Sequence, residues 1–287
     1  MPLLLPLLLW LLAATIPQHA PAPAAAPTTA GSATAQHLNV LMIGNSYTNN
    51  SWSHFVDFAA ADANTTLTLE LATRGGWTTL DHYQNRQNTV YQGGSQSLLD
   101  LLNQEAWDYV VIQEQSTRPS QAYLGHIIER NQFERGMLNL DVVIKREAPT
   151  AEVVYFQTWP RNYNNSYLTT YFNNEPREMH RATSTAYARA ATATGADIVH
   201  VGTAWNYSMY NNPGLTLHSG DGSHAGNAGG YLAGAMFFAY LYDQSPVGSS
   251  YTAGLSQADS DWLQSLADGA WQLLDWLSGL KMGKITI

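Results

Sequence analysis

The chain has 287 residues, of which 45% are hydrophobic, so its length allows one large α/β domain or two smaller domains. Only 12% of the residues are charged and the net charge is −9, which favours a neutral polar substrate over nucleic acid or anionic membrane surfaces, because the latter attract basic patches. The absence of cysteine excludes disulfides, thiolate metal sites and a cysteine nucleophile.

The chain begins with an apolar run and a stretch rich in Pro, Ala and Thr. Residues 3–14 have the length of the apolar core of a signal peptide and are too short to cross a bilayer. Ala33-Thr34-Ala35 offers an Ala-x-Ala cleavage site, although the first Lys or Arg is Arg74, so the usual basic start is missing. We expect residues 1–36 to be a signal peptide and leader, and the protein to be secreted or periplasmic with no stable membrane span. A lipid-facing anchor or a poorly defined gene start are the alternatives.

The remaining chain alternates between strand and helix patterns. Residues 38–44 (LNVLMIG) form a continuous apolar run, as expected of a strand covered on both faces. We expect further strands at 67–73, 108–113, 151–158 and 197–202, and helices at 53–63, 97–104, 126–147, 176–194, 227–243 and 259–279. This alternation predicts an α/β domain over residues 37–287, a three-layer α/β/α fold with a central parallel sheet of about five strands. The Asn- and Tyr-rich segment 159–178 is too polar for a core and is expected to form a loop at the rim.

Candidate reactive residues follow the ends of four of these strands. In parallel sheets the ligand crevice lies beyond the carboxyl ends of the strands, so these residues are expected to meet at one edge. They are Ser46 after the first strand, Gly75 and Gly76 after the second, Gln113, Glu114 and Gln115 after the third, and Asp221 and His224 in the loop after the fifth.

The residue types suit acyl transfer. A serine hydroxyl such as that of Ser46 needs an adjacent base and a third group that orients the base. Asp221 and His224 are three residues apart, so one tight turn could bring the carboxylate to the imidazole. The amides of Ser46 and Gly76 (or Gly75), with a side-chain amide, would bind a developing oxyanion.

These blocks resemble the SGNH hydrolase superfamily, the GDSL-type esterases. The nucleophile block resembles Gly44-Asn45-Ser46, the oxyanion glycine block resembles Gly75-Gly76, and the Asp-x-x-His block resembles Asp221-Gly222-Ser223-His224. Asn45 replaces the usual Asp, and a Gln-Glu-Gln-Ser sequence stands where the family has Gly-x-Asn. That version resembles branches that include carbohydrate O-acetyl esterases. The resemblance implies that Gln113, or as second choice Gln115, completes the oxyanion hole.

Other residues have structural interpretations beside functional ones. Ser46 could be an ordinary turn serine, and Asp221 could be a helix N-cap or Asx-turn residue. No His-x-x-x-His or His-Glu-x-x-His spacing occurs, so no metal or other cofactor is expected. Residues that could contact substrate, or could equally be structural, are Asn45, Trp77, Glu114, Trp159 and His218.

We therefore expect a serine esterase that removes short acyl groups, acetyl first, from carbohydrate through Ser46, His224 and Asp221. A lipolytic or aryl esterase is the alternative within the same class. A catalytically silent carbohydrate-binding module on the same scaffold is the alternative from another class. The partner is expected to be a small-molecule or polysaccharide ester, and the sequence leaves the oligomeric state open.

Overall fold

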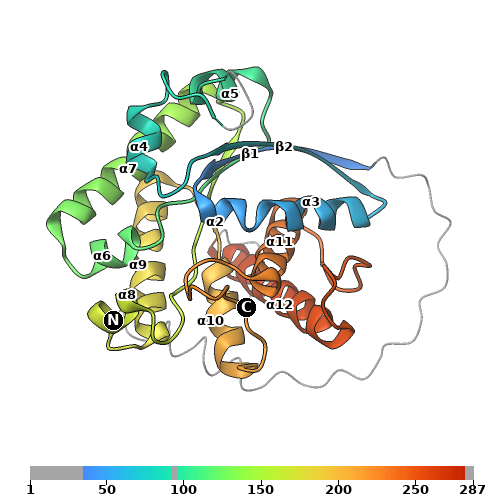
Figure 1. Cartoon of the computed structure of the whole chain (residues 1–287). Coiled ribbons are helices and arrows are strands. Elements are labelled where there is room, and N and C mark those ends of the chain that lie inside the picture. Colours follow the sequence, from blue (N-terminus) through green and yellow to red (C-terminus); the bar gives the residue numbers. More distant parts are fainter. Residues whose placement is uncertain (1–34, 92–95, 282–287) are drawn as a thin grey trace. The chain divides into compact units, whose positions relative to one another are not determined.

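The computed structural model describes residues 35–91 and 96–281, with side chains up to residue 273 (Figure 1). The expected leader therefore lies almost entirely outside the described residues. Gln36 is already part of the first strand.

The described chain contains one five-stranded sheet flanked by helices. The strands are β1 (Gln36–Gly44), β2 (Thr65–Thr73), β3 (Tyr109–Ile112), β4 (Glu152–Phe156) and β5 (Asp197–Val199). The helices are α2 (Ser46–Asn49), α3 (Trp52–Ala61), α4 (Thr79–Gln84), α5 (Leu98–Gln104), α6 (Arg118–Tyr123), α7 (Ile127–Glu147), α8 (Ser166–Phe172), α9 (Pro176–Thr194), α10 (Val201–Asn211), α11 (Asn227–Tyr242) and α12 (Gln257–Lys281).

All strand pairs are parallel, in the order β2-β1-β3-β4-β5. The expected three-layer α/β/α fold with a parallel sheet is confirmed. Because all strands run in the same direction, their carboxyl ends lie along one edge, where the segments with Ser46, Gly76 and Gln113 start. Asp221 and His224 do not directly follow β5 as expected, because helix α10 lies between that strand and their loop.

Alternate residues of each strand enter two separate cores. Val40 and Met42 of β1 belong to the core with α3, α10, α11 and α12, whereas Leu41 and Ile43 belong to the core with α5, α7 and α9. Figure 1 shows α3 and α11 on one face of the sheet and α5 and α7 on the other. Burying each such aliphatic side chain contributes about 1.5–3 kcal/mol, so the central strand is fixed from both sides.

The structure differs from the sequence-based expectation in several places, since helices α2, α4, α6, α8 and α10 were not expected. The fifth strand ends at Val199 rather than residue 202, because helix α10 begins at Val201. The expected rim loop 159–178 contains helix α8, which Asn165 caps by accepting a hydrogen bond from the Tyr167 amide. Among the described helices, none is long and apolar enough to cross a membrane.

Candidate active site

The turn after β1 places Ser46 at the first position of helix α2. Asn45 caps this helix, since its Oδ1 accepts a hydrogen bond from the Tyr47 amide and its Nδ2 donates to the Trp77 carbonyl at 2.9 Å. A Cβ on Gly44 would lie 2.3 Å from Thr48 Oγ1, so only glycine fits there. The Gly-Asn-Ser sequence thus forms a tightly packed turn that presents the serine at the carboxyl end of the strand.

Ser46, His224 and Asp221 form a continuous hydrogen-bonded series. Ser46 Oγ lies 2.9 Å from His224 Nε2, and His224 Nδ1 lies 2.5 Å from Asp221 Oδ2. Asp221 and His224 share one loop, whereas Ser46 lies 178 positions before His224 in the sequence. The fold therefore brings together the three residues that the sequence singled out.

The Asp221 carboxylate makes the contacts expected of both interpretations that the sequence left open, the partner of His224 and the Asx-turn residue. Its Oδ1 accepts hydrogen bonds from the amides of Ser223 and His224, each at 2.9 Å, and from Ser219 Oγ at 2.8 Å. These bonds form an Asx-type turn, while Oδ2 faces the imidazole. Asp221 is not a helix N-cap, because α11 begins only at Asn227.

The carboxyl of Asp221 stays ionised in this setting. Burial acts to raise its pKa, but the hydrogen bonds from His224, Ser219 and the two amides outweigh burial and place the pKa well below the ordinary value. An ionised carboxylate beside Nδ1 fixes the imidazole so that Nε2 faces the serine hydroxyl.

A column of stacked aromatic rings supports the loop that carries His224. Trp159 stacks on Tyr47 with 4.4 Å between ring centroids and on Trp205 with 4.2 Å. Trp159 Nε1 and Tyr47 Oη both donate to the Ser223 carbonyl, at 2.9 and 2.7 Å. Because Trp159 is completely buried, the expectation that it contacts substrate is wrong, and its role is to position the loop.

His218 is also a buried support. Its Nε2 lies 2.8 Å from the Pro160 carbonyl oxygen, and its ring packs edge-on against Trp205. Burial lowers the pKa of His218 to about 4, against the hydrogen bond to Pro160, so the ring is neutral. Only 5% of the residue is exposed, but it belongs to the lining of a polar depression beside Asp221, so its substrate contact stays a prediction.

The side chain of Gln113 forms hydrogen bonds with the turn that carries Ser46. Its Oε1 accepts hydrogen bonds from the Asn45 amide at 2.9 Å and from Thr48 Oγ1 at 3.1 Å, while Nε2 donates to the Glu114 carbonyl. The residue is fully buried. The prediction that the Gln113 side chain completes the oxyanion hole is therefore wrong, because its amide group is already used in these hydrogen bonds. Asn45 is likewise occupied as a cap and only 2% exposed, so it does not contact substrate.

Glu114 links the second and third blocks of the site. Its Oε1 accepts from the amides of Thr79 and Gln115, and its Oε2 accepts from Thr79 Oγ1 at 2.5 Å. Burial raises the pKa of Glu114 to about 7, with these hydrogen bonds and nearby Arg118 acting in the opposite direction. Its complete burial also excludes the expected substrate contact.

The remaining oxyanion candidates have free donors. Gly76 has a left-handed φ of 73° in the turn closed by the Trp77 amide and the Arg74 carbonyl. Gln115 Oε1 accepts from the amide and hydroxyl of Thr117. Within the described part of the chain, neither the Gly76 amide nor Gln115 Nε2 has a hydrogen-bond partner. Trp77 is half-buried beside them, so its predicted substrate contact stays a prediction.

Sequence reasoning missed Tyr47, Ser219, Ser223 and Arg161. Arg161 is 8% exposed, and its Nη2 donates to Ser116 Oγ at 2.9 Å. Its guanidinium carbon lies 5.5 Å from the centre of the Tyr47 ring, and burial lowers its pKa to about 10. The only sequence signal was position: these residues are near neighbours of the reactive blocks or lie in the loop after the fourth strand.

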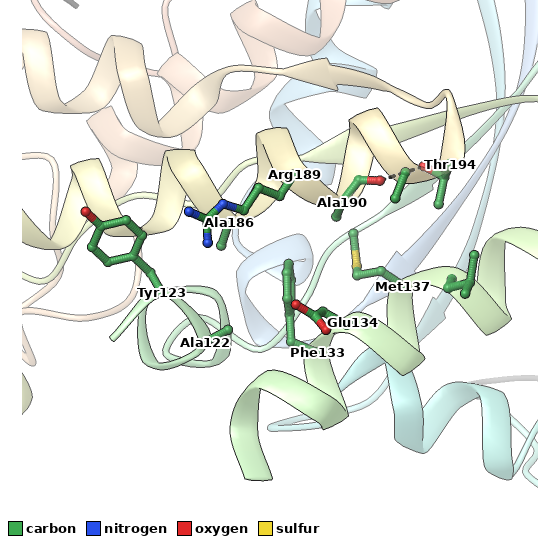
Figure 2. Close-up of a pocket in the computed structure, with 11 residues that line it drawn as sticks. Ala122, Tyr123, Phe133, Glu134, Met137, Ala186, Arg189, Ala190 and Thr194 are labelled. Atoms are coloured by element: carbon green, nitrogen blue, oxygen red, sulfur yellow. Dashed lines mark hydrogen bonds between the residues drawn. The ribbon is translucent and has the colours of Figure 1, made fainter. Parts of the chain in front are cut away.

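A groove elsewhere on the surface lacks the reactive residues. It has a volume of about 260 Å³ and lies between α6, α7 and α9. Figure 2 shows Ala186 and Ala190 of α9 facing Phe133 and Met137 of α7 across it. Its lining is mainly apolar and includes none of the candidate site residues. Within the described residues, no group of three or more His, Asp or Glu side chains could bind a metal ion.

Comparisons with known proteins identify similar structures. No family model and no curated protein matches the sequence. A DUF4886 family protein from Bacteroides uniformis has a TM-score of 0.71 at 21% identity, and the match covers 82% of this chain and 95% of that one. A candidate SGNH hydrolase from Slackia heliotrinireducens has a TM-score of 0.54 at 25% identity, covering 71% and 98%. A candidate GDSL-like lipase from Parabacteroides merdae has a TM-score of 0.50 at 11% identity, covering 71% and 95%. The fold of this chain is therefore similar to that of the SGNH hydrolases.

Proposed function

We propose that the protein is a serine esterase that hydrolyses short-chain acyl esters, acetyl first, on carbohydrate. The observation that carries this proposal is the hydrogen-bonded series from Ser46 Oγ through His224 to Asp221, with distances of 2.9 and 2.5 Å. The order of groups is the one that activates a serine hydroxyl: nucleophile, base and orienting carboxylate. The 25%-identical neighbour described as an SGNH hydrolase supports hydrolysis as the reaction class.

In the first half-reaction Ser46 Oγ attacks the ester carbonyl carbon. His224 Nε2 accepts the hydroxyl proton, and Asp221 stabilises the imidazolium that forms. The tetrahedral intermediate then collapses, the bond to the alcohol oxygen breaks, and His224 returns its proton to the leaving alkoxide. General base catalysis of this kind contributes about 10²–10⁴-fold to the rate.

Water completes the reaction in a second attack of the same kind. His224 removes a proton from water, the hydroxide attacks the acyl carbon, and the carboxylic acid leaves while Ser46 regains its proton. The amides of Ser46 and Gly76 and the side chain of Gln115 would donate to the oxyanion in both steps. Each such donor contributes about 3–4 kcal/mol to transition-state stabilisation in a comparable site.

The chemistry around the triad favours a carbohydrate ester over a lipid ester. The loop next to Asp221 is rich in Asn and Tyr, and these side chains offer hydrogen bonds to neutral hydroxyl groups. A long acyl chain would instead require an apolar cleft beside the nucleophile.

The test is hydrolysis of p-nitrophenyl acetate, butyrate and octanoate, and of acetylated xylan, by wild type and Ser46→Ala. We expect activity on acetate and acetylated xylan that is lost in the variant. A preference for octanoate would indicate a lipolytic enzyme. Equal background rates in both proteins would refute the esterase and favour the silent binding module.

A further inference from the structure

A polar depression opens directly beside Asp221. It has a volume of about 420 Å³ and is lined by residues of two loops, 162–165 and 216–222. Because Asp221 contacts His224 and His224 contacts Ser46, one imidazole ring separates the depression from the nucleophile. A ligand in the depression would therefore contact the Asp221 end of the hydrogen-bonded series that ends at Ser46.

The two walls of the depression are tied together by hydrogen bonds. The Asn162 amide donates to the Gly222 carbonyl at 2.9 Å, and Asn165 Nδ2 donates to the Asp221 carbonyl at 3.3 Å. Asn165 Oδ1 is held in turn by the Tyr167 amide at the start of α8. These bonds form the depression before any ligand binds, which reduces the entropic cost of binding.

The lining determines the class of ligand. It offers amides of asparagine, hydroxyls of threonine and serine, and the ring of Tyr163, which is 44% exposed. Asp221 is the only charged side chain in the lining, since His218 is neutral near pH 7. An anionic ligand would be repelled by Asp221, and an acyl chain would leave the polar groups without hydrogen bonds. Neutral polyhydroxyl compounds fit both conditions.

Two groups in the lining are available to such a ligand. Among the described residues, Asn162 Nδ2 and the Thr216 hydroxyl have no hydrogen-bond partner. Two hydrogen bonds position Tyr163: its backbone amide donates to Asn162 Oδ1 at 2.9 Å, and its ring hydroxyl donates to the Tyr210 hydroxyl at 3.3 Å. A steadied, exposed aromatic ring with free donors beside it is suited to stack on a sugar ring.

We infer that this depression is a sugar-binding subsite for the unit next to the one esterified, so that the enzyme acts on neutral oligosaccharide chains rather than on single sugars. The inference rests on the proposed esterase for its role in turnover, but not for binding itself. Occupancy of the subsite also distinguishes a carbohydrate substrate from lipid and aryl esters, because those esters would leave the subsite empty.

Binding and turnover test the inference separately. Calorimetry measures binding of unesterified xylotriose to wild type, Ser46→Ala, Tyr163→Ala and the control Tyr171→Ala. Tyr171 lies on α8, is 40% exposed and does not line the depression. We expect wild type, Ser46→Ala and the control to bind alike, and Tyr163→Ala to bind about fivefold to tenfold more weakly.

Kinetics then compare acetylated xylotriose with acetylated xylose and p-nitrophenyl acetate. We expect a lower KM for the trisaccharide than for the monosaccharide, and a rise in KM for the trisaccharide alone in Tyr163→Ala. Thr216→Trp, which fills the depression from an exposed position, should raise the same KM. Xylotriose binding that is absent in wild type or unaffected by both substitutions would overturn the subsite. Retained binding without any ester hydrolysis would refute the proposed esterase and leave the subsite standing.

Discussion

Replacing Asn45 by Asp introduces the residue that the superfamily usually has at this position, and the structure indicates that it is harmful here. Asn45 uses both ends of its amide: Oδ1 accepts from the Tyr47 amide at 3.1 Å and Nδ2 donates to the Trp77 carbonyl at 2.9 Å. A carboxylate can accept the first bond but cannot donate the second. In Asn45→Asp, an oxygen therefore faces the Trp77 carbonyl oxygen in a site that is 2% exposed.

The expected loss of stability depends on pH. Leaving the Trp77 carbonyl without its donor costs about 1–3 kcal/mol. Each unit by which burial raises the pKa of the new carboxyl adds about 1.4 kcal/mol when it ionises. We expect Asn45→Asp to lose about 3 kcal/mol at pH 8, or about 6–12 °C in Tm for a domain of this size. At pH 5 the protonated carboxyl can donate to Trp77, so most of the loss should be recovered.

The assay is thermal unfolding followed by circular dichroism at pH 5 and pH 8, with p-nitrophenyl acetate hydrolysis measured in parallel. Asn45→Ala is the matched control, since it loses both hydrogen bonds but cannot ionise, and its deficit relative to wild type should be similar at the two pH values. Because the Trp77 carbonyl anchors the turn that holds Gly76, kcat should fall at pH 8 in Asn45→Asp. Wild-type stability of Asn45→Asp at pH 8, or a deficit equal at both pH values, would refute this reasoning.

Three further substitutions test the buried network and the oxyanion donors. Folding raises the pKa of Glu114 from 4.5 to about 7. The contribution of protonated Glu114 to the free energy of unfolding is therefore complete below pH 4.5 and is lost as the pH rises from 4.5 to about 7. Denaturant unfolding should show that the free energy of unfolding of Glu114→Gln rises relative to wild type by about 3 kcal/mol between pH 4.5 and pH 8. The same pH dependence of stability in both proteins would contradict this. Gly44→Ala places a Cβ 2.3 Å from Thr48 Oγ1 and should lower the free energy of unfolding by about 3 kcal/mol or more, so wild-type denaturation would count against the packing described. Gln115→Ala should reduce kcat for p-nitrophenyl acetate about 100-fold with little change in KM, whereas Gln113→Ala should chiefly reduce stability; an unchanged kcat in Gln115→Ala would remove it from the oxyanion hole.

The parallel sheet could be predicted because its strands are short apolar runs separated by long helical segments. The short helices could not, since α2, α4, α6 and α8 have four to seven residues and depend on caps and tertiary contacts. Helix α10 was read partly as strand because Val201 continues the apolar run of β5. In the fold, Gly202 lets this helix approach the Thr158 carbonyl, to which a Cβ would come within 2.1 Å.

The candidate triad could be predicted because Ser46 directly follows β1 and because Asp221 and His224 have the spacing of an Asp-x-x-His block, although helix α10 separates them from β5. The oxyanion assignment could not, because the choice between Gln113 and Gln115 depends on which amide is consumed by internal hydrogen bonds. Trp159 was also indistinguishable from a substrate contact by position alone, since only the fold shows it buried against the loop that carries His224. Secretion stays a prediction, because the leader lies outside the described residues.

The proposed nucleophile can be tested most directly with a fluorophosphonate probe and peptide mass spectrometry. We expect one adduct on wild-type protein, located on Ser46, much slower labelling of His224→Ala, and none on Ser46→Ala although it remains folded. An adduct at another residue, or a Ser46→Ala variant that still hydrolyses acetyl esters at the wild-type rate, would contradict the proposed catalytic serine.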